Sequence, residues 1–215
     1  MRRVTVTLGL AASILALTAC NQAKNAAASA ENATAAATAK VADAAADVTG
    51  GAKMLKADAS DQEKIDSAMS AAPKSIGEGA TIMDMTADGK MKELRKGTNN
   101  FTCMADSPAT PGPDPMCFDG NAAEWVNAWV GKKTPADGKT GVMYMLAGGT
   151  DASNTDPYAT APSDANHWIK TGPHLMVVGS KALLTGYPSG ADPDTSKPYV
   201  MWAGTPYAHL MVPVK

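Results

Sequence analysis

The sequence predicts an α+β domain with a mainly antiparallel sheet, one packed helix, and long Gly/Pro-rich loops. Three observations support this fold class. Strand-like runs do not alternate regularly with helices, one amphipathic helix carries two tryptophans, and polar stretches rich in Gly, Pro, Asp and Ser separate the runs. Regular alternation would instead predict an α/β fold with a parallel sheet.

The first elements of the domain follow one another closely. Ser60-Asp61-Gln62-Glu63 is a capping box, which predicts a helix that ends before Pro73. Residues 80–86 and 90–97 flank a turn at Asp88-Gly89, so they predict a β-hairpin. Residues 99–105 add a strand before a Pro-rich loop.

A second helix is predicted over residues 120–133, with Asp119 at its start. Trp125 and Trp129 are four positions apart, so they share one face of this helix and should pack against the sheet. Further strands are predicted at residues 140–148, 173–179, 198–204 and 208–214.

The N-terminal residues 1–19 are typical of an export signal, with Arg2 and Arg3 before an uncharged apolar run. Leu17-Thr18-Ala19-Cys20 then resembles the lipobox of bacterial lipoproteins. This resemblance implies that Cys20 is acylated, for example with palmitate, and anchors the protein to a membrane. The alternative is an ordinary secretory signal with a chance cysteine. Asn21 in place of Asp favours the outer membrane, with the domain facing the periplasm.

Residues 20–59 are predicted to be an Ala-rich tether, and residues 60–215 a single folded domain. Alanine favours helix, but a helix without bulky apolar residues has little surface to bury. Gly50-Gly51 interrupts the stretch. A coiled-coil arm is the alternative, and it would need a heptad of larger residues that the stretch does not contain.

Cys103 and Cys117 predict a disulfide bond, because an even pair in an exported protein is usually oxidised. Closing a loop of about 15 residues stabilises a fold by roughly 3 kcal/mol in the chain-entropy model. A redox-active pair is the alternative, but it would favour Cys-x-x-Cys spacing.

Methionine is unusually common, with 13 residues against two phenylalanines. In strand-like runs, several methionines lie two positions from another methionine or from a histidine, and side chains at that spacing share one face of a strand. These pairs are Met83/Met85, Met143/Met145, His174/Met176 and His209/Met211. Thioether sulfur with imidazole suits copper(I), so the last two pairs are the candidate metal ligands. The favoured alternative is that these methionines simply fill the core, with no cofactor.

The C-terminal runs "TGPHLMVVG" and "PYVMWAGTPYAHLMVPV" resemble an uncharacterised family of bacterial exported proteins. The resemblance covers the folded part of the chain. The residues of this sequence that match its motifs are His174, Met176, Met201, His209 and Met211. It implies a domain without an established activity, so no catalytic residue is carried over from it.

Other chemistries have less support. No Gly-x-Ser-x-Gly, His-Glu-x-x-His or phosphate-binding glycine loop occurs. Asp151, Asn154 and Asp156 lie in a glycine-flanked loop that is a candidate for binding a hard cation such as calcium, but it lacks the spacing and the bidentate Glu of an EF-hand. With 19 basic and 21 acidic residues and no basic cluster after the signal, nucleic acid is not an expected partner. A non-enzymatic envelope lipoprotein, binding or structural, is therefore the leading hypothesis. A copper-binding protein is second and an envelope hydrolase third.

The repeated His-Leu-Met-Val segments predict two strands of one sheet. If they paired in register, His174 and His209 could lie within about 5 Å of each other on one face. The favoured expectation is that Met176 and Met211 are buried, and that the histidines form hydrogen bonds near the strand starts without metal.

Replacing Cys20 with Ser tests the lipobox. The variant should lose its acyl chains and appear as a soluble or uncleaved form, because serine cannot form the thioether. Fractionation of membranes with mass spectrometry of the N-terminus measures this. Membrane retention of a processed variant would contradict the lipoprotein hypothesis.

Overall fold

The computed structural model describes residues 53–86, 89–110 and 112–214. The predicted signal, Cys20 and most of the predicted tether lie outside these residues. Among the described helices, none combines the length and apolar character that a membrane crossing requires.

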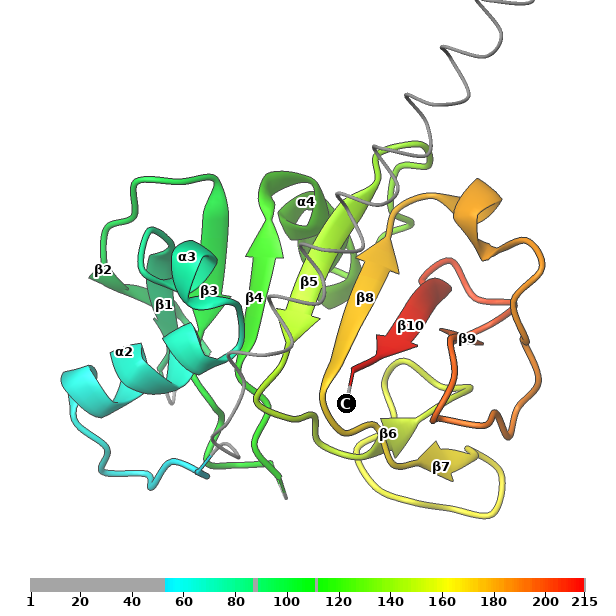
Figure 1. Ribbon diagram of the computed structural model, residues 1–215. Helices are drawn as coiled ribbons and strands as arrows, with labels where there is room; N and C mark the ends of the chain where they lie inside the picture. Colours follow the sequence, from blue (N-terminus) through cyan, green and yellow to red (C-terminus); the bar gives the residue numbers. More distant parts are fainter. Residues whose placement is uncertain (1–52, 87–88, 111, 215) are drawn as a thin grey trace, which may run out of the picture. The chain divides into compact units, whose positions relative to one another are not determined.

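An eight-stranded mixed sheet forms the centre of the domain, in the order β2-β1-β3-β4-β5-β8-β10-β9 (Figure 1). Every pair of neighbours is antiparallel except β1 and β3, which are parallel. The strands are β1 (Thr81–Met85), β2 (Met91–Arg95), β3 (Phe101–Met104), β4 (Met116–Asp119), β5 (Gly141–Met145), β8 (His174–Val178), β9 (Tyr199–Met201) and β10 (His209–Pro213). Two short strands, β6 (Ala152–Ser153) and β7 (Trp168–Ile169), form a separate ladder. The α+β prediction is confirmed.

Three helices accompany the sheet in the described part of the chain. They are α2 (Asp61–Ser70), α3 (Lys74–Gly77) and α4 (Gly120–Val130), with a 3₁₀ turn η1 (Lys181–Leu184). The predicted capping box of α2 is present, since Ser60 accepts from the Glu63 backbone and Glu63 accepts from the Ser60 backbone. Asp119 caps α4 with its side chain alone, accepting from Ala122 N–H at 2.8 Å.

Three strands were not predicted. β4 has only four residues, and it follows a Pro-rich stretch and runs directly into α4. Its last residue, Asp119, is also the N-cap of α4. The sequence around Asp119 therefore predicts the start of the helix but not the strand before it. β6 and β7 have two residues each, which is too short to produce a periodic pattern.

The predicted disulfide bond joins Cys103 of β3 to Cys117 of β4. The two cysteines face each other directly across the antiparallel ladder. Both are fully buried against α2 and α3. The bond therefore closes the Pro-rich loop at its base, where the loop joins the sheet.

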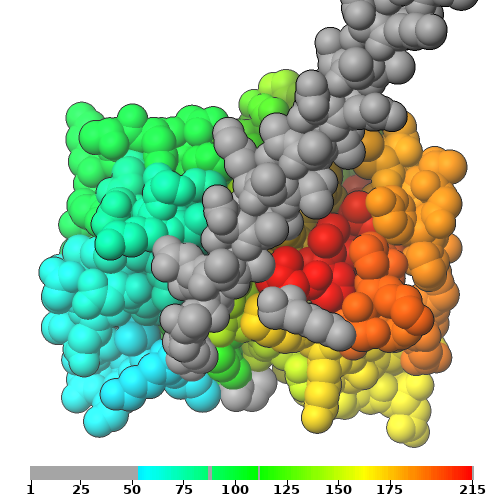
Figure 2. Space-filling model, in the orientation of Figure 1, coloured from blue at the N-terminus to red at the C-terminus, as the bar shows by residue number. Residues whose placement is uncertain are grey.

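Two apolar clusters cover opposite faces of the sheet, since the successive residues Cys117 and Phe118 of β4 belong to different clusters. One contains Ile82 and the two cysteines and packs against α2 and α3. The other contains Trp125 of α4 together with buried methionines of β5, β8, β9 and β10. In the space-filling view, the earlier segments, cyan to green, occupy one half of the visible face, and the later segments, yellow to red, occupy the other half (Figure 2).

Helix α4 approaches β5 more closely than a side chain would allow. A Cβ atom on Gly141 would lie 2.3 Å from the backbone nitrogen of Ala122 and 2.6 Å from its Cα. The Asp119 carboxylate also accepts from Val142 N–H at 3.3 Å, which links the start of the helix to the strand. These contacts hold the start of α4 directly against β5.

Replacing Gly141 with Ala should lower the free energy of unfolding by about 2–3 kcal/mol, because backbone atoms of α4 cannot move aside without displacing the helix. Urea denaturation measures the change. Gly120→Ala is the matched control, since a Cβ there meets nothing within 4 Å. It should leave stability unchanged or raise it by less than about 1 kcal/mol. Equal stability of the two variants would contradict the close-packing argument.

Candidate functional site

A row of three methionines crosses the middle of the sheet. Met143 on β5 lies opposite Met176 on β8, and Met176 lies opposite Met211 on β10. Directly opposed side chains on neighbouring strands have Cβ atoms about 4.5–5.5 Å apart. All three are buried. Three thioethers therefore lie side by side on one face of the sheet.

One histidine lies on each side of this row. On one side His174 is opposite Met145, and on the other His209 is opposite Met201. Residues two apart on a strand share a face, so both histidines lie on the face that carries the methionine row. The strands are antiparallel and His174 is opposite Pro213, so the two histidines are not cross-strand partners. They are placed diagonally, with Met176 and Met211 between them.

A cavity of about 180 Å³ opens on this face. Helix α4 contributes Trp125 and Trp129, and Trp202 follows β9. The thioether lining comprises Met116, Met143, Met145, Met176, Met201 and Met211. His174, His209, Asp114, Thr150, Ala152 and Thr171 complete the wall. Soft sulfur and imidazole nitrogen are thus the main donors that the cavity presents.

The two imidazoles are held in the same way. Nδ1 of His174 donates to the carbonyl oxygen of Gly172 at 2.6 Å, and Nδ1 of His209 donates to that of Tyr207 at 3.0 Å. In each case the acceptor is two residues back in the chain. A carbonyl oxygen can only accept, so each neutral ring has its proton on Nδ1 and a lone pair on Nε2. Metal-binding histidines are commonly oriented by this kind of second hydrogen bond.

His209 is the more deeply placed of the two, with 1% of its surface exposed. Its Nε2 is buried and has no hydrogen-bond partner within the described residues. Burial, together with a smaller effect of the nearby His174, lowers its pKa to about 4. Burial also lowers the pKa of His174. Both rings are therefore neutral at neutral pH, which is the form that binds metals.

One edge of the cavity is polar. The hydroxyl oxygen of Thr150 is buried there without a partner in the described structure. Asp114 lies at the same cavity, and burial raises its pKa to about 6, with the neighbouring Asp106 also raising it. Asp106 holds this loop in place by accepting from the backbone N–H groups of Asp114 at 2.8 Å and Leu55 at 2.7 Å.

The His174 ring is supported by a glycine. A Cβ atom on Gly149 would lie 2.8 Å from Cε1 of His174 and 2.6 Å from the Thr171 hydroxyl oxygen. The backbone of Gly149 therefore packs directly against the imidazole. Position 149 must be small for His174 to keep its orientation.

The structure brings together His174, Met176, His209 and Met211, the four candidate ligands identified from the sequence. It adds Met143 and Met145, whose spacing was noted, and Met116, which has no partner two positions away. Met83 and Met85 lie on β1 near the far edge of the sheet and do not line this cavity. No group of three His, Cys, Asp or Glu side chains able to hold a metal occurs in the described residues.

His167 and Asn154, which were also noted in the sequence, form hydrogen bonds outside the cavity. His167 contacts the exposed Asp192 through Nδ1 at 2.8 Å, away from the cavity. Asn154 is buried, and its amide donates to the carbonyls of Gly190 and Ala191. The loop containing Asn154 is thus tied to another loop by its own side chain.

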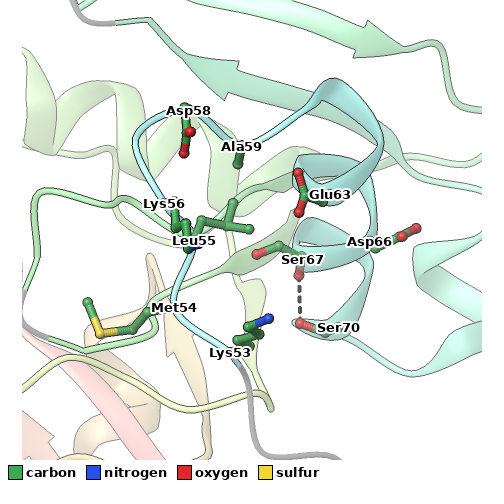
Figure 3. A pocket seen from close by; sticks show the side chains of 10 residues that line it. All are labelled: Lys53, Met54, Leu55, Lys56, Asp58, Ala59, Glu63, Asp66, Ser67 and Ser70. Carbon is green, nitrogen blue, oxygen red and sulfur yellow. Dashed lines mark hydrogen bonds between the residues drawn. The ribbon is translucent and has the colours of Figure 1, made fainter.

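A second cavity, of about 510 Å³, lies between residues 53–59 and α2 (Figure 3). Its lining combines Lys53, Lys56, Asp58, Glu63 and Asp66 with short polar and apolar side chains. All five of these charged residues are exposed. This groove offers solvated charges of both signs and no histidine or aromatic ring, so we do not regard it as the functional site.

Comparison of the chain with models of protein families, with curated proteins and with solved structures gave no match. The function must therefore be argued from the site itself.

The lowered pKa of His209 predicts a pH-dependent contribution to stability. Its folded-state pKa of about 4 lies below the ordinary 6.5, so protonation favours the unfolded chain. The contribution is complete above about pH 6.5 and is lost as the pH falls towards 4. Relative to His209→Phe, the unfolding free energy of the wild type should fall by up to about 1.4 kcal/mol per pH unit in this window.

Urea denaturation of both proteins across this range measures the difference. Asp114, whose pKa is raised to about 6, acts in the opposite direction because acid favours its folded state. Its contribution is present in both proteins and cancels in the comparison. A difference that does not change with pH would show that His209 is not a buried neutral imidazole.

Proposed function

We propose that this protein is a lipid-anchored envelope protein that binds a copper(I) ion in the cavity lined by histidine and methionine. The anchor is the one that the lipobox at Leu17–Cys20 implies. The protein is proposed to carry or store the ion and not to catalyse a reaction. The cell envelope, where copper is handled outside the cytoplasm, suits such a role.

One observation carries this proposal. Two buried imidazoles each use Nδ1 to hold a backbone carbonyl, and each keeps a lone pair on Nε2 at a cavity whose other donors are mainly thioethers. Imidazole and thioether together suit copper(I). An ion between His174 and His209 would lie over the row that contains Met176 and Met211.

The charge of the donors favours a singly charged ion. Neutral imidazole and thioether bring no negative charge. The one carboxyl group of the lining, Asp114, has a pKa of about 6 and is ionised at neutral pH, so the lining supplies one negative charge, which balances a singly charged ion. Moving an ion out of water into such a site costs more as its charge increases. Copper(I) and silver(I) are therefore better matched to the cavity than zinc(II) or copper(II).

Core packing alone does not account for the arrangement. Methionine fills gaps well, but here a cavity of about 180 Å³ remains among six methionines. A buried acceptor left without a partner costs about 1–3 kcal/mol. Filling a core would not require an unsatisfied imidazole nitrogen at His209. A bound ion satisfies it.

A second candidate is a small uncharged molecule as ligand. The cavity is larger than one ion needs, and three indole rings form part of its wall. Such a ligand would use His209 Nε2 and the Thr150 hydroxyl as its polar partners. It would bind without copper, and this separates the two candidates in the experiment below.

Titration with copper(I) under anaerobic conditions, against a chromogenic copper(I) chelator, tests the proposal. The full-length protein is solubilised in detergent, and ascorbate serves as reductant because thiols would compete for the ion. We expect uptake of one equivalent. His174→Ala and His209→Ala should each weaken binding by at least the roughly 10- to 100-fold that loss of an outer-shell contact costs.

His167→Ala is the matched control, because this third histidine does not line the cavity and should leave affinity unchanged. Met176→Leu with Met211→Leu keeps the packing volume and removes two sulfurs, so it should also weaken binding. The proposal is wrong if the wild type does not compete with the chelator, or if His174→Ala and His209→Ala both retain wild-type affinity.

A further inference from the structure

Trp202 has an unusual backbone conformation. Its φ angle is 55°, in the left-handed region that bulky side chains rarely adopt. Such conformations cost about 1–3 kcal/mol and persist only where the surroundings enforce them, often at functional sites. Gly204, two positions later, has a φ of 82°. The turn after β9 thus places a tryptophan where a glycine would be unstrained.

Several hydrogen bonds enforce this conformation. The backbone N–H of Trp202 donates to the carbonyl of Asn154 at 2.8 Å, and its indole Nε1 donates to that of Ser153 at 2.9 Å. Its own carbonyl accepts from the Thr205 hydroxyl at 2.8 Å. Asn154 and Ser153 are each only 1% exposed. The indole is therefore fixed at both its backbone and its ring.

The fixed indole lies against the deeper histidine. Its ring is nearly parallel to that of Trp125, at 6.2 Å between centroids and an interplanar angle of 6°. The His209 ring meets both indoles at steep angles, 4.9 Å from Trp202 and 5.4 Å from Trp125. Two indole rings thus pack against the His209 imidazole, whose Nε2 has no hydrogen-bond partner within the described residues, and the Nε1 proton of Trp202 is already donated to Ser153.

We infer that Trp202 is a ligand-binding residue of the copper site, contacting the singly charged ion through its ring and keeping water from His209. This inference rests on the proposed function and names the residue that favours a soft, weakly hydrated cation. The face of an aromatic ring is negative and attracts cations, and tryptophan is the best of the aromatic residues in this respect. The hydrogen bonds of its backbone and Nε1 keep the ring in place before the ion arrives.

Silver(I) serves as a redox-inert probe of this contact. Of the four tryptophans, only Trp168 is absent from the cavity lining, so Trp168→Phe leaves all emission to the cavity indoles. In the full-length Trp168→Phe protein, one equivalent of silver(I) should quench the fluorescence through the heavy-atom effect. Unchanged emission with silver(I) bound would overturn the inference, and this result needs no change at position 202.

Affinity measurements on variants give the second readout. Copper(I) affinity should decrease from the wild type to Trp202→Phe and again to Trp202→Leu. The leucine variant should bind on the order of 2- to 30-fold more weakly than the wild type. Trp168→Phe is the matched control and should bind as the wild type does. Urea denaturation of the metal-free proteins shows whether each variant is folded.

The outcomes separate the two proposals. Tight, histidine-dependent uptake of copper(I) that is unchanged in the folded Trp202→Leu variant would overturn the role of Trp202 and leave the proposed function standing. No uptake by the wild type would overturn both. Graded loss of affinity, together with quenching by silver(I), would support both.

Discussion

The candidate site depends on the register with which β10 pairs with β8. Met211 lies opposite Met176, and the antiparallel direction then places His174 and His209 at opposite ends of the methionine row. A shift of one residue would turn the ligands of one strand to the other face of the sheet. The register is held on the far side by β9, where Met201 lies opposite His209. The arrangement of the candidate metal ligands therefore follows from a few backbone hydrogen bonds between segments that are distant in the sequence.

Burial of the two imidazoles follows from the same arrangement. Each ring satisfies one nitrogen with the carbonyl two residues before it, which allows the ring to be buried while neutral. The second nitrogen of His209 has no hydrogen-bond partner within the described residues. Helix α4 and the strained turn at Trp202 then close the cavity with aromatic rings. Under the proposed function, an ion that binds only the folded state would add its binding free energy to the stability of the fold.

Much of the fold could be predicted because its signals are local. The capping box at Ser60, the turn at Asp88-Gly89 and the tryptophan spacing of α4 each lie within a few residues. The ligand pairs were visible for the same reason, since residues two apart on a strand share a face. Met116 and Trp202 could not be identified as cavity residues in this way. Neither has a methionine or histidine two positions away, and each lines the cavity because of its place in the tertiary structure.

The sequence by itself determined the local elements, the cysteine pair and the soft character of the donors. It did not determine that three of the four spaced pairs would meet while Met83 and Met85 would lie elsewhere. The order of strands and their register decided this, since both depend on contacts between segments far apart in the chain. Only the tertiary structure could show that the repeated His-Leu-Met-Val segments line one cavity, because their antiparallel pairing joins the two methionines and separates the two histidines.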